Sequence, residues 1–384
     1  MRTFPVKTER NMRIGIVCYP IYGGSGVVAT ELGRFLARRG HQVHFISYAL
    51  PFRLQREFHE NIYFHETEQV NYPVLNSNLY TLSLAVKMSQ IVQDENLDLV
   101  HVHYAVPHAI SAFLAKRLVS PRRVPVVTTL HGTDITLVGR SPSFFPVVKF
   151  GIQESDAVVA VSKWLRTETY EHFQITKEVE VIYNFVDTEE FKPGRSPCRR
   201  EHFAKADEKV LLHISNFRPV KRLEDVVRIC ALINARVASR LILVGDGPDR
   251  DKAFRLAQEL NIADRVRFVG KQESIQPYFS IADLFLFPSE YESFGLAALE
   301  AMSCEVPVIT SDGGGLPEVL EQGVSGHLCS VGSVECMADY GVELLTNAEK
   351  ARAMGAAGRK RAIEHFSADR AVTEYENLYK RLLS

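Results

Sequence analysis

Two glutamates, Glu292 and Glu300, flank a short segment in which a strand is expected to turn into a helix. The apolar run at residues 284–287 predicts a buried strand, and Ser293 is well placed to cap the helix that follows. From Phe294 onward the residues are small or apolar, which is the composition of a buried helix. Because a carboxylate should not be buried in such a setting alone, we expect a ligand or a cation beside each acid.

The start of this expected helix is suited to an anion. The backbone N–H groups of Phe294, Gly295 and Leu296 would lack partners within the helix and would face the same side as Glu292. A nucleotide sugar would use every feature, with its sugar at Glu292, its diphosphate at the helix N-terminus and its ribose at Glu300. The alternative is that Glu292 only complements the helix dipole and Glu300 pairs with a distant cation. We favour the ligand, because the two acids flank a turn suited to phosphate.

Two cations follow another expected strand, at residues 210–215. Arg218 and Lys221 could bind a diphosphate, the guanidinium through two parallel hydrogen bonds and the ammonium as a point charge. Both could instead be exposed loop residues. The paired glutamates make the phosphate interpretation the better one.

Metal binding has little support in the sequence. His101, His103 and His108 lie close together, but no neighbouring cysteine or carboxylate completes a ligand set. Asp249 and Asp251 have the D-x-D spacing, but they stand where acids favour a helix N-terminus. We therefore expect neither a metal nor another cofactor.

The 384 residues suit two domains of ordinary size. The formal net charge of −1, without blocks of like charge, gives no sign of a nucleic-acid partner. The six cysteines lack C-x-x-C spacing, which predicts reduced thiols. No apolar run reaches membrane-spanning length, and residues 1–11 lack the apolar core of a signal peptide. We expect a cytoplasmic protein without stable membrane association, and leave open a homo-oligomer.

The chain begins with a strand, a glycine-rich turn and a helix, which predicts a doubly wound α/β unit. The strand is expected at residues 12–18 and the turn at residues 23–26, whose glycines do not fit the G-x-G-x-x-G dinucleotide fingerprint. This disfavours a nicotinamide dehydrogenase. The backbone at Gly24 could approach a ligand phosphate or an acceptor, and Ser25 could add a hydroxyl. A tight turn with no ligand is the alternative.

Strands and helices then alternate through two halves of the chain. A polar stretch with Pro193, Gly194 and Pro197 predicts a linker between them. In the first half, polar residues that include Tyr104 and His131 follow expected strands, at the strand ends where such sheets bind ligands. We expect a flexible lead-in at residues 1–11, Rossmann-like domains at 12–185 and 207–366, and a C-terminal helix at 367–384.

The paired glutamates, separated by seven residues and with Ser-Phe-Gly after the first, resemble the donor-site motif of the retaining family-four glycosyltransferases of GT-B fold. The resemblance implies two Rossmann-like domains facing a cleft, a final helix that crosses back to the first domain, and a nucleotide-sugar donor. Positive side chains would replace a metal at the diphosphate.

The resemblance also assigns roles to single residues. Lys221 matches the family's lysine, but Asn216 stands where the family has an arginine, so Arg218 becomes the candidate for the missing guanidinium. The loop that lines the base pocket would include Gln272. A family histidine near the reacting sugar matches His131, which could hydrogen-bond the donor sugar or assist the acceptor hydroxyl.

Longer segments resemble one branch of the family, whose members transfer N-acetylglucosamine from UDP-N-acetylglucosamine to the hydroxyl of L-malate in bacillithiol biosynthesis. A small dicarboxylate needs cations and hydroxyls, although each candidate residue could instead be an exposed or packing residue. The segments are CYPIYGGSGVVATELG, LPFRL, HVHYAVPHA, TTLHGTDIT, FGIQESDAVVAVS and ISNFRPVKR, and the acceptor candidates are Ser25, Arg53, Tyr104, Thr129 and Lys149.

Two alternatives keep the same donor site. The acceptor could be a sugar, an inositol phosphate or a lipid-linked molecule, and a lipid would favour an exposed apolar and basic stretch. The candidate stretch, residues 144–150, is expected in the core. A non-catalytic nucleotide-sugar sensor would retain the cations but could dispense with His131 and the acceptor residues.

Overall fold

The computed structural model describes residues 11–20, 23–54, 59–68, 79–194 and 199–384. The chain divides into two compact units. Unit 1 contains the chain up to Val161 together with Leu165–Ile182 and Val372–Ser384, and unit 2 contains Ser162–Trp164 and Tyr183–Ala371. Each unit is an α/β structure with a parallel sheet, as the alternation of strands and helices predicts.

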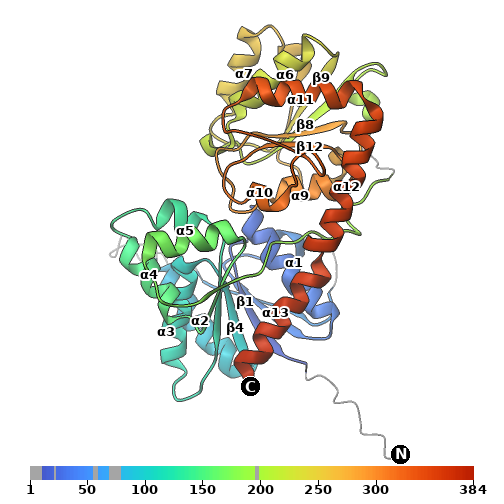
Figure 1. Cartoon of the computed structure of the whole chain (residues 1–384). Coiled ribbons are helices and arrows are strands. Elements are labelled where there is room, and N and C mark those ends of the chain that lie inside the picture. Colours follow the sequence, from blue (N-terminus) through green and yellow to red (C-terminus); the bar gives the residue numbers. More distant parts are fainter. Residues whose placement is uncertain (1–10, 21–22, 55–58, 69–78, 195–198) are drawn as a thin grey trace, which may run out of the picture. The chain divides into compact units, whose positions relative to one another are not determined.

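Unit 1 is built on a sheet of seven strands within its described residues, in the order β3-β2-β1-β4-β5-β6-β7. Helices lie on both sides of it (Figure 1). Apolar residues of α2 and α3 pack with Val100 and Val102 on one face. The strands are β1 (Arg13–Val17), β2 (Gln42–Ser47), β3 (Ile62–Glu66), β4 (Leu99–His103), β5 (Val126–Leu130), β6 (Ala157–Ala160) and β7 (Val179–Val181). The helices are α1 (Gly24–Arg38), α2 (Tyr80–Asp94), α3 (Ile110–Leu118), α4 (Phe145–Glu154) and α5 (Lys163–Phe173).

The last helix of the chain, α13 (Ala368–Leu383), completes unit 1 from Val372 onward. The hydroxyl of Tyr379 lies 2.7 Å from Nδ1 of His101 on β4. Glu376 accepts hydrogen bonds from Arg39 at 2.8 Å and is bonded to Nε2 of His41 at 2.9 Å. A segment distant in sequence therefore satisfies buried polar groups of the first sheet (Figure 1).

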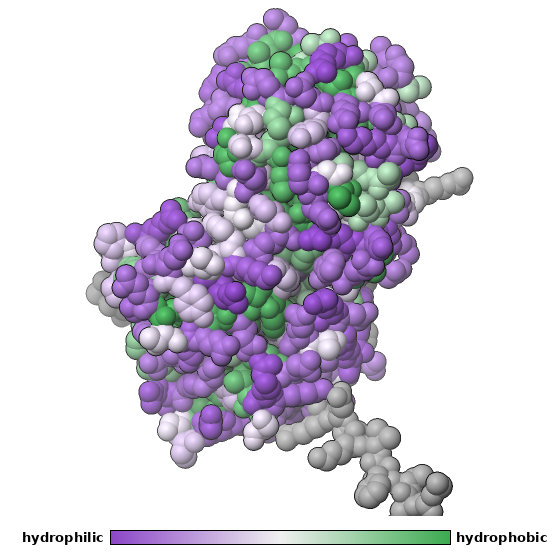
Figure 2. Space-filling view, in the orientation of Figure 1, coloured by the Kyte–Doolittle hydropathy of each residue, from purple (hydrophilic) through white to green (hydrophobic). Residues whose placement is uncertain are grey.

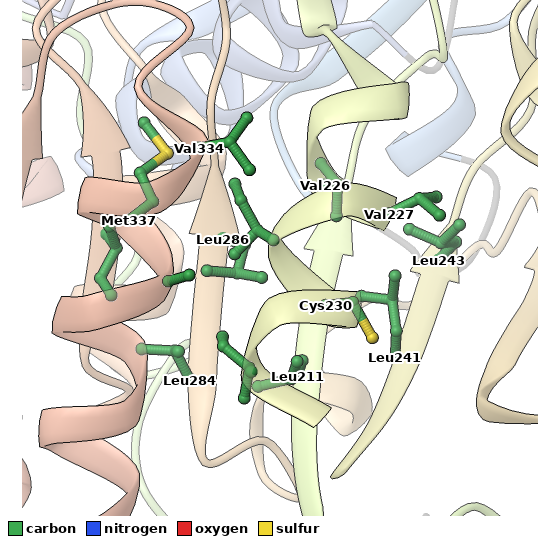
Figure 3. Close-up of a cluster of buried hydrophobic side chains, with 14 of the residues drawn as sticks. Leu211, Val226, Val227, Cys230, Leu241, Leu243, Leu284, Leu286, Val334 and Met337 are labelled. Atoms are coloured by element: carbon green, nitrogen blue, oxygen red, sulfur yellow. The ribbon is translucent and has the colours of Figure 1, made fainter. Parts of the chain in front are cut away.

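Unit 2 has a sheet of six strands within its described residues, in the order β10-β9-β8-β11-β12-β13. Helices α6 and α11 pack on it through the apolar cluster in Figure 3, where Cys230 lies beside Leu241. The strands are β8 (Lys209–Ile214), β9 (Ser239–Val244), β10 (Val266–Gly270), β11 (Leu284–Phe287), β12 (Val308–Ser311) and β13 (His327–Cys329). The helices are α6 (Leu223–Asn234), α7 (Arg250–Glu259), α8 (Gln276–Phe279), α9 (Leu296–Ser303), α10 (Leu316–Val319), α11 (Val334–Thr346) and α12 (Ala348–Phe366).

The prediction that every cysteine is reduced was wrong. Cys329, which ends β13, forms a disulfide with Cys336 in the first turns of α11, and their Cα atoms are 6.2 Å apart. The short loop between strand and helix brings the two thiols together, which residue spacing alone did not reveal. Cys18, Cys230 and Cys304 are free and buried, and Cys198 lies outside the described residues.

Hydrophilic residues predominate on the face of each unit that Figure 2 shows, with hydrophobic ones interspersed. Among the described helices, none combines the length and the apolar composition that crossing a membrane requires.

The bond between Tyr379 and His101 allows a test of the C-terminal helix. We expect Tyr379→Phe to destabilise unit 1 by about 1–3 kcal/mol, because it leaves a buried imidazole nitrogen without a partner. Denaturant unfolding followed by circular dichroism would measure the loss. Asn377→Ala, an exposed change on the same helix, is the control and should unfold like the wild type. Equal stability of all three proteins would contradict this account.

Candidate functional site

The turn between β11 and α9 holds the first group of predicted site residues. Gly295 caps α9 with a φ of +101°, a left-handed conformation that favours glycine. The helix therefore begins two residues later than a cap at Ser293 would have placed it. Phe294 is buried against Tyr183 and Phe366, so its side chain serves the core and only its backbone could meet a ligand. Leu296 is half-buried in the first turn of α9.

Glu292 and Lys221 form the central polar contact of this unit. Nζ of Lys221 donates to Oε1 of Glu292 at 2.5 Å, and both side chains are mostly buried, at 17% and 13% exposure. The ammonium also lies 5.4 Å from the ring centroid of Phe287. The sequence predicted both as ligand-binding residues, and the structure brings them together as partners.

A run of three glycines after β12 supports Glu292 and was not recognised from the sequence. Gly315 donates its N–H to the carbonyl oxygen of Glu292 at 2.7 Å. Gly314 has a φ of +72°, and a Cβ atom there would overlap the backbone of Glu292. The signal that could have found this loop is the glycine run at residues 313–315 directly after an apolar strand.

The loop after β8 carries Arg218, the second cation predicted to bind the diphosphate. Phe217 is fully buried with a φ of +42°, and it separates the exposed residues Asn216 and Arg218. The carbonyl oxygen of Val220 accepts a hydrogen bond from the N–H of Glu290 at 2.8 Å, which ties this loop to the one after β11. Arg218 therefore stands on the same loop as Lys221, with its side chain accessible.

The last two predicted donor residues are Glu300 and Gln272, and the structure gives each of them a place within the protein. Glu300 is buried in α9, with 5% of its surface exposed. Gln272 follows β10, and its side-chain amide donates to the carbonyl oxygen of Val269 at 2.8 Å. That bond fixes the end of its own loop.

A stack of histidines occupies the carboxyl ends of β4 and β5 in unit 1. The rings of His101 and His103 stack at a centroid distance of 4.5 Å, and Nδ1 of His103 lies 2.8 Å from Nε2 of His131. Nε2 of His101 is bonded to the hydroxyl of Thr129 at 2.7 Å, and that hydroxyl lies 3.1 Å from the hydroxyl of Tyr375. Thr129 is therefore buried and links His101 to Tyr375. The sequence had instead predicted that its hydroxyl would contact the acceptor.

Tyr104 and Ser25 meet beside the stack. The hydroxyl of Tyr104 donates to Oγ of Ser25 at 2.6 Å, and the Tyr104 ring lies 5.2 Å from that of His131. Gly24 begins α1, and a Cβ atom there would meet nothing within 4 Å. Ser25, Tyr104 and His131, all predicted site residues, are therefore neighbours in unit 1.

The other two predicted acceptor residues, Arg53 and Lys149, lie on other elements. Arg53 donates to Oε1 of Glu31 at 3.0 Å, and Arg34 donates to the same carboxylate. Lys149 is half-buried on α4.

The expected burial of residues 144–150 was wrong. Phe144, Val147 and Phe150 are 47%, 40% and 40% exposed. The helix α4 presents these side chains outward, and Val148 is the residue of this stretch that is fully buried.

Comparison with known proteins decides the family. The N-acetyl-alpha-D-glucosaminyl L-malate synthase of Bacillus anthracis is 47% identical over 373 residues, which cover 97% of each chain. Residues 22–190 match the model described as Glycosyltransferase Family 4, and residues 195–361 match the one described as Glycosyl transferases group 1. The chain belongs to glycosyltransferase family 4. An uncharacterized glycosyltransferase of Methanocaldococcus jannaschii is 28% identical over 96% of this chain and 98% of its own.

Solved structures confirm the predicted GT-B fold of this glycosyltransferase. A glycosyltransferase from Rickettsia africae superposes with a TM-score of 0.81 at 21% identity, over 97% of this chain and 99% of its own. The Anabaena protein HepE, solved in complex with UDP and glucose, superposes with a TM-score of 0.79 at 21% identity, over 96% and 100% of the two chains.

Burial sets the protonation of the unit 1 cluster of this glycosyltransferase. It lowers the pKa of His101 and of His131 to about 3, helped by the neighbouring imidazoles, and it lowers that of His103 well below its usual value. Burial also raises the pKa of Tyr104 to about 12. The cluster therefore offers neutral hydrogen-bonding groups near neutral pH.

Asp134 is the carboxyl group beside this cluster. Burial raises its pKa to about 6, and backbone N–H groups of Ala105 and Gly132 donate to its two oxygens, each at 3.0 Å. These bonds hold the backbone after β4 beside the backbone after β5. We interpret Asp134 as a structural residue of these two turns.

The buried histidines predict an acid-sensitive glycosyltransferase. Their pKa values in the folded state lie below the unfolded value of 6.5, so the unfolded chain binds more protons as the pH falls from 6.5 toward about 3. Stability should be full above pH 6.5 and fall below it, by about 1.4 kcal/mol per pH unit for each such histidine. Thermal unfolding at about pH 7.5 and about pH 5.5 measures this. His202→Gln, at an exposed histidine, should leave the dependence unchanged. An unfolding temperature that is the same at both pH values would be inconsistent with neutral buried imidazoles.

Proposed function

We propose that this glycosyltransferase transfers N-acetylglucosamine from UDP-N-acetylglucosamine to the hydroxyl of L-malate, with retention at the anomeric carbon. The observation that carries the proposal is the 47% identity to the Bacillus anthracis synthase, which extends over both units. Mannosyltransferases that act on a phosphatidylinositol monomannoside are 27–29% identical over 72–74% of this chain. The stronger and longer match therefore favours malate over a lipid-linked acceptor.

Unit 2 is suited to the donor. A diphosphate would compete with Glu292 for Lys221, and its arrival would release the carboxylate to accept hydrogen bonds from sugar hydroxyls. Arg218 and the N-terminus of α9 add positive charge at the same edge of the sheet. Once the diphosphate is bound, these positive groups would stabilise the charge that develops on the leaving UDP. No metal is needed for that step.

Unit 1 is suited to the acceptor. His131, Tyr104 and Ser25 are neutral polar groups gathered at one strand end, where they could orient a hydroxyl. Malate would attack the face from which UDP departs, and its proton would pass to a departing phosphate oxygen. Asp134 could serve as a nucleophile only in a double displacement, and its burial and its backbone bonds weigh against that route. We also propose that the protein acts in the cytoplasm.

A lipid-linked acceptor is the second candidate. The exposure of Phe144, Val147 and Phe150 favours it, because these apolar side chains lie at the start of α4 and along it, with Lys149 among them in the sequence. The 47% identity to the relative named as an L-malate synthase outweighs this surface. The acceptor assay below separates the two.

Malate-dependent release of UDP is the first expected outcome. Purified protein should release UDP from UDP-N-acetylglucosamine when L-malate is present, without added metal, and release should be far slower with D-malate or with no acceptor. A coupled assay for UDP, with mass spectrometry of the product, measures this. Binding of the donor without malate-dependent release would refute malate as acceptor, and the assay would then be repeated with a phosphatidylinositol acceptor.

Glu292→Ala should lower turnover by about 100-fold or more, because it removes an interaction with the transferred sugar. The protein should still fold but with lower stability, because Lys221 loses its buried partner. Glu290→Ala is the matched control, since Glu290 lies two residues earlier and is exposed. Steady-state kinetics and circular dichroism of both variants make the comparison. A folded Glu292→Ala protein with normal turnover would remove Glu292 from the donor site.

A further inference from the structure

Three side chains that could hold a metal ion lie in unit 1, on elements that the proposed transfer does not use. His44 on β2, His65 on β3 and Glu95 at the end of α2 each offer one ligand atom, and these atoms all lie within 4.8 Å of one another. This group does not include the three neighbouring histidines that the sequence analysis weighed as metal ligands, which are His101, His103 and His108.

The strand register explains why the two histidines meet. His44 pairs with Tyr63 and Ile46 pairs with His65 in the parallel ladder of β2 and β3. Because side chains alternate along a strand, His44, Tyr63 and His65 share one face of the sheet. Ile46 belongs to the apolar cluster formed with α2 on this face, and Glu95 caps the end of that helix.

The spacing of the two imidazoles fits one tetrahedral ion. Nδ1 of His44 lies 3.0 Å from Nε2 of His65, and the two rings are inclined by 12°. Two nitrogen ligands of a tetrahedral zinc ion, each about 2.0–2.1 Å from it, are about 3.3 Å apart. Small rotations of the rings would therefore admit the ion, and the carboxylate of Glu95 is within reach as a third ligand.

A packing role alone does not explain why position 44 is a histidine. His44 is 1% exposed, and its Nε2 atom has no hydrogen-bond partner among the described residues. An apolar aromatic residue could stack on Tyr63 without that cost. The bond between His44 and His65 satisfies only one nitrogen of the buried ring.

The protonation of the group suits a metal. Burial lowers the pKa of His44 to about 4 and lowers that of His65, so both rings are neutral, as ligands must be. Arg13 and Lys87 also lower these values and would oppose a cation, whereas Glu95 acts in the opposite direction. The side chain of Arg13 is exposed and is held at the carbonyl oxygen of Glu95, at 3.1 Å.

We propose that His44, His65 and Glu95 bind a divalent transition metal, with zinc the best fit, and that water completes a tetrahedron. The proton of the bond between the imidazoles moves to the other nitrogen of its own ring, so both rings stay neutral. The ion joins β2, the edge strand β3 and the end of α2, and it stabilises this side of unit 1. It takes no part in sugar transfer.

Isothermal titration of the tag-free, chelator-treated full chain with zinc chloride tests the site. We expect one ion per chain, an increase in the thermal unfolding temperature, and ligand-field bands typical of a tetrahedral ion when Co²⁺ replaces zinc. His65→Gln and Glu95→Gln should each weaken binding by about 10-fold or more. Both residues are only half-buried, so these variants should fold.

His202→Gln is the matched control and should bind zinc as the wild type does, since His202 is exposed and lies in unit 2. The absence of zinc binding would overturn the proposal. Zinc binding that His65→Gln and Glu95→Gln leave unchanged would overturn it equally, because the ion would then be held elsewhere. UDP release by the metal-free protein is a separate readout, so failure of the metal site and failure of the transfer activity can be distinguished.

Discussion

The ion pair between Lys221 and Glu292 is the contact on which the candidate donor site depends. Both side chains are mostly buried, and a buried pair that loses one member leaves an uncompensated charge, at a cost of about 3–5 kcal/mol. The pair holds the loop after β8 beside the turn after β11, and the bond from Glu290 to the carbonyl oxygen of Val220 secures the same approach. An anionic ligand that draws Lys221 toward itself would therefore also change the surroundings of Glu292.

Glycine makes this approach possible. At Gly245, Gly247 and Gly314, a Cβ atom would overlap the backbone of a neighbouring loop. These glycines let the loops after β8, β9, β11 and β12 pack backbone against backbone. Such packing fixes the backbones of the loops that carry Lys221 and Glu292 before a ligand arrives, which limits the rearrangement that stabilising a leaving group requires.

Local sequence patterns predicted the fold well, and distant partnerships poorly. Apolar runs followed by glycine or polar turns predicted strands of both sheets, such as β1, β8 and β11, because a strand buried on both faces has that pattern. The short edge strand β13 (His327–Cys329) was not predicted. The cap at Gly295 differed from the expected Ser293 because the left-handed turn moved the helix start. The exposure of α4 could not be predicted either, since an apolar helix has the same composition whether or not a neighbour covers it.

In the candidate site too, the sequence predicted single residues better than the contacts between them. The sequence indicated Glu292 and Lys221, but not that they are partners, since 71 positions separate them. Thr129 was expected at an acceptor, whereas contacts with His101 and Tyr375 make it part of the core. No local pattern could reveal this, because Tyr375 reaches β5 from the far end of the chain.

In each unit, a predicted ligand-binding cation is paired with a glutamate of the protein. Lys221 donates to Glu292 and Arg53 donates to Glu31, and both contacts are hydrogen bonds between opposite charges. The proposed substrates carry the same kind of group, a diphosphate on the donor and two carboxylates on the acceptor. Each glutamate can thus stand in for a substrate anion and keep a buried cation paired until exchange occurs. The neutral histidines and Tyr104 hold no charge to exchange, so they suit the acceptor hydroxyl, and recognition of the malate carboxylates would fall to Arg53.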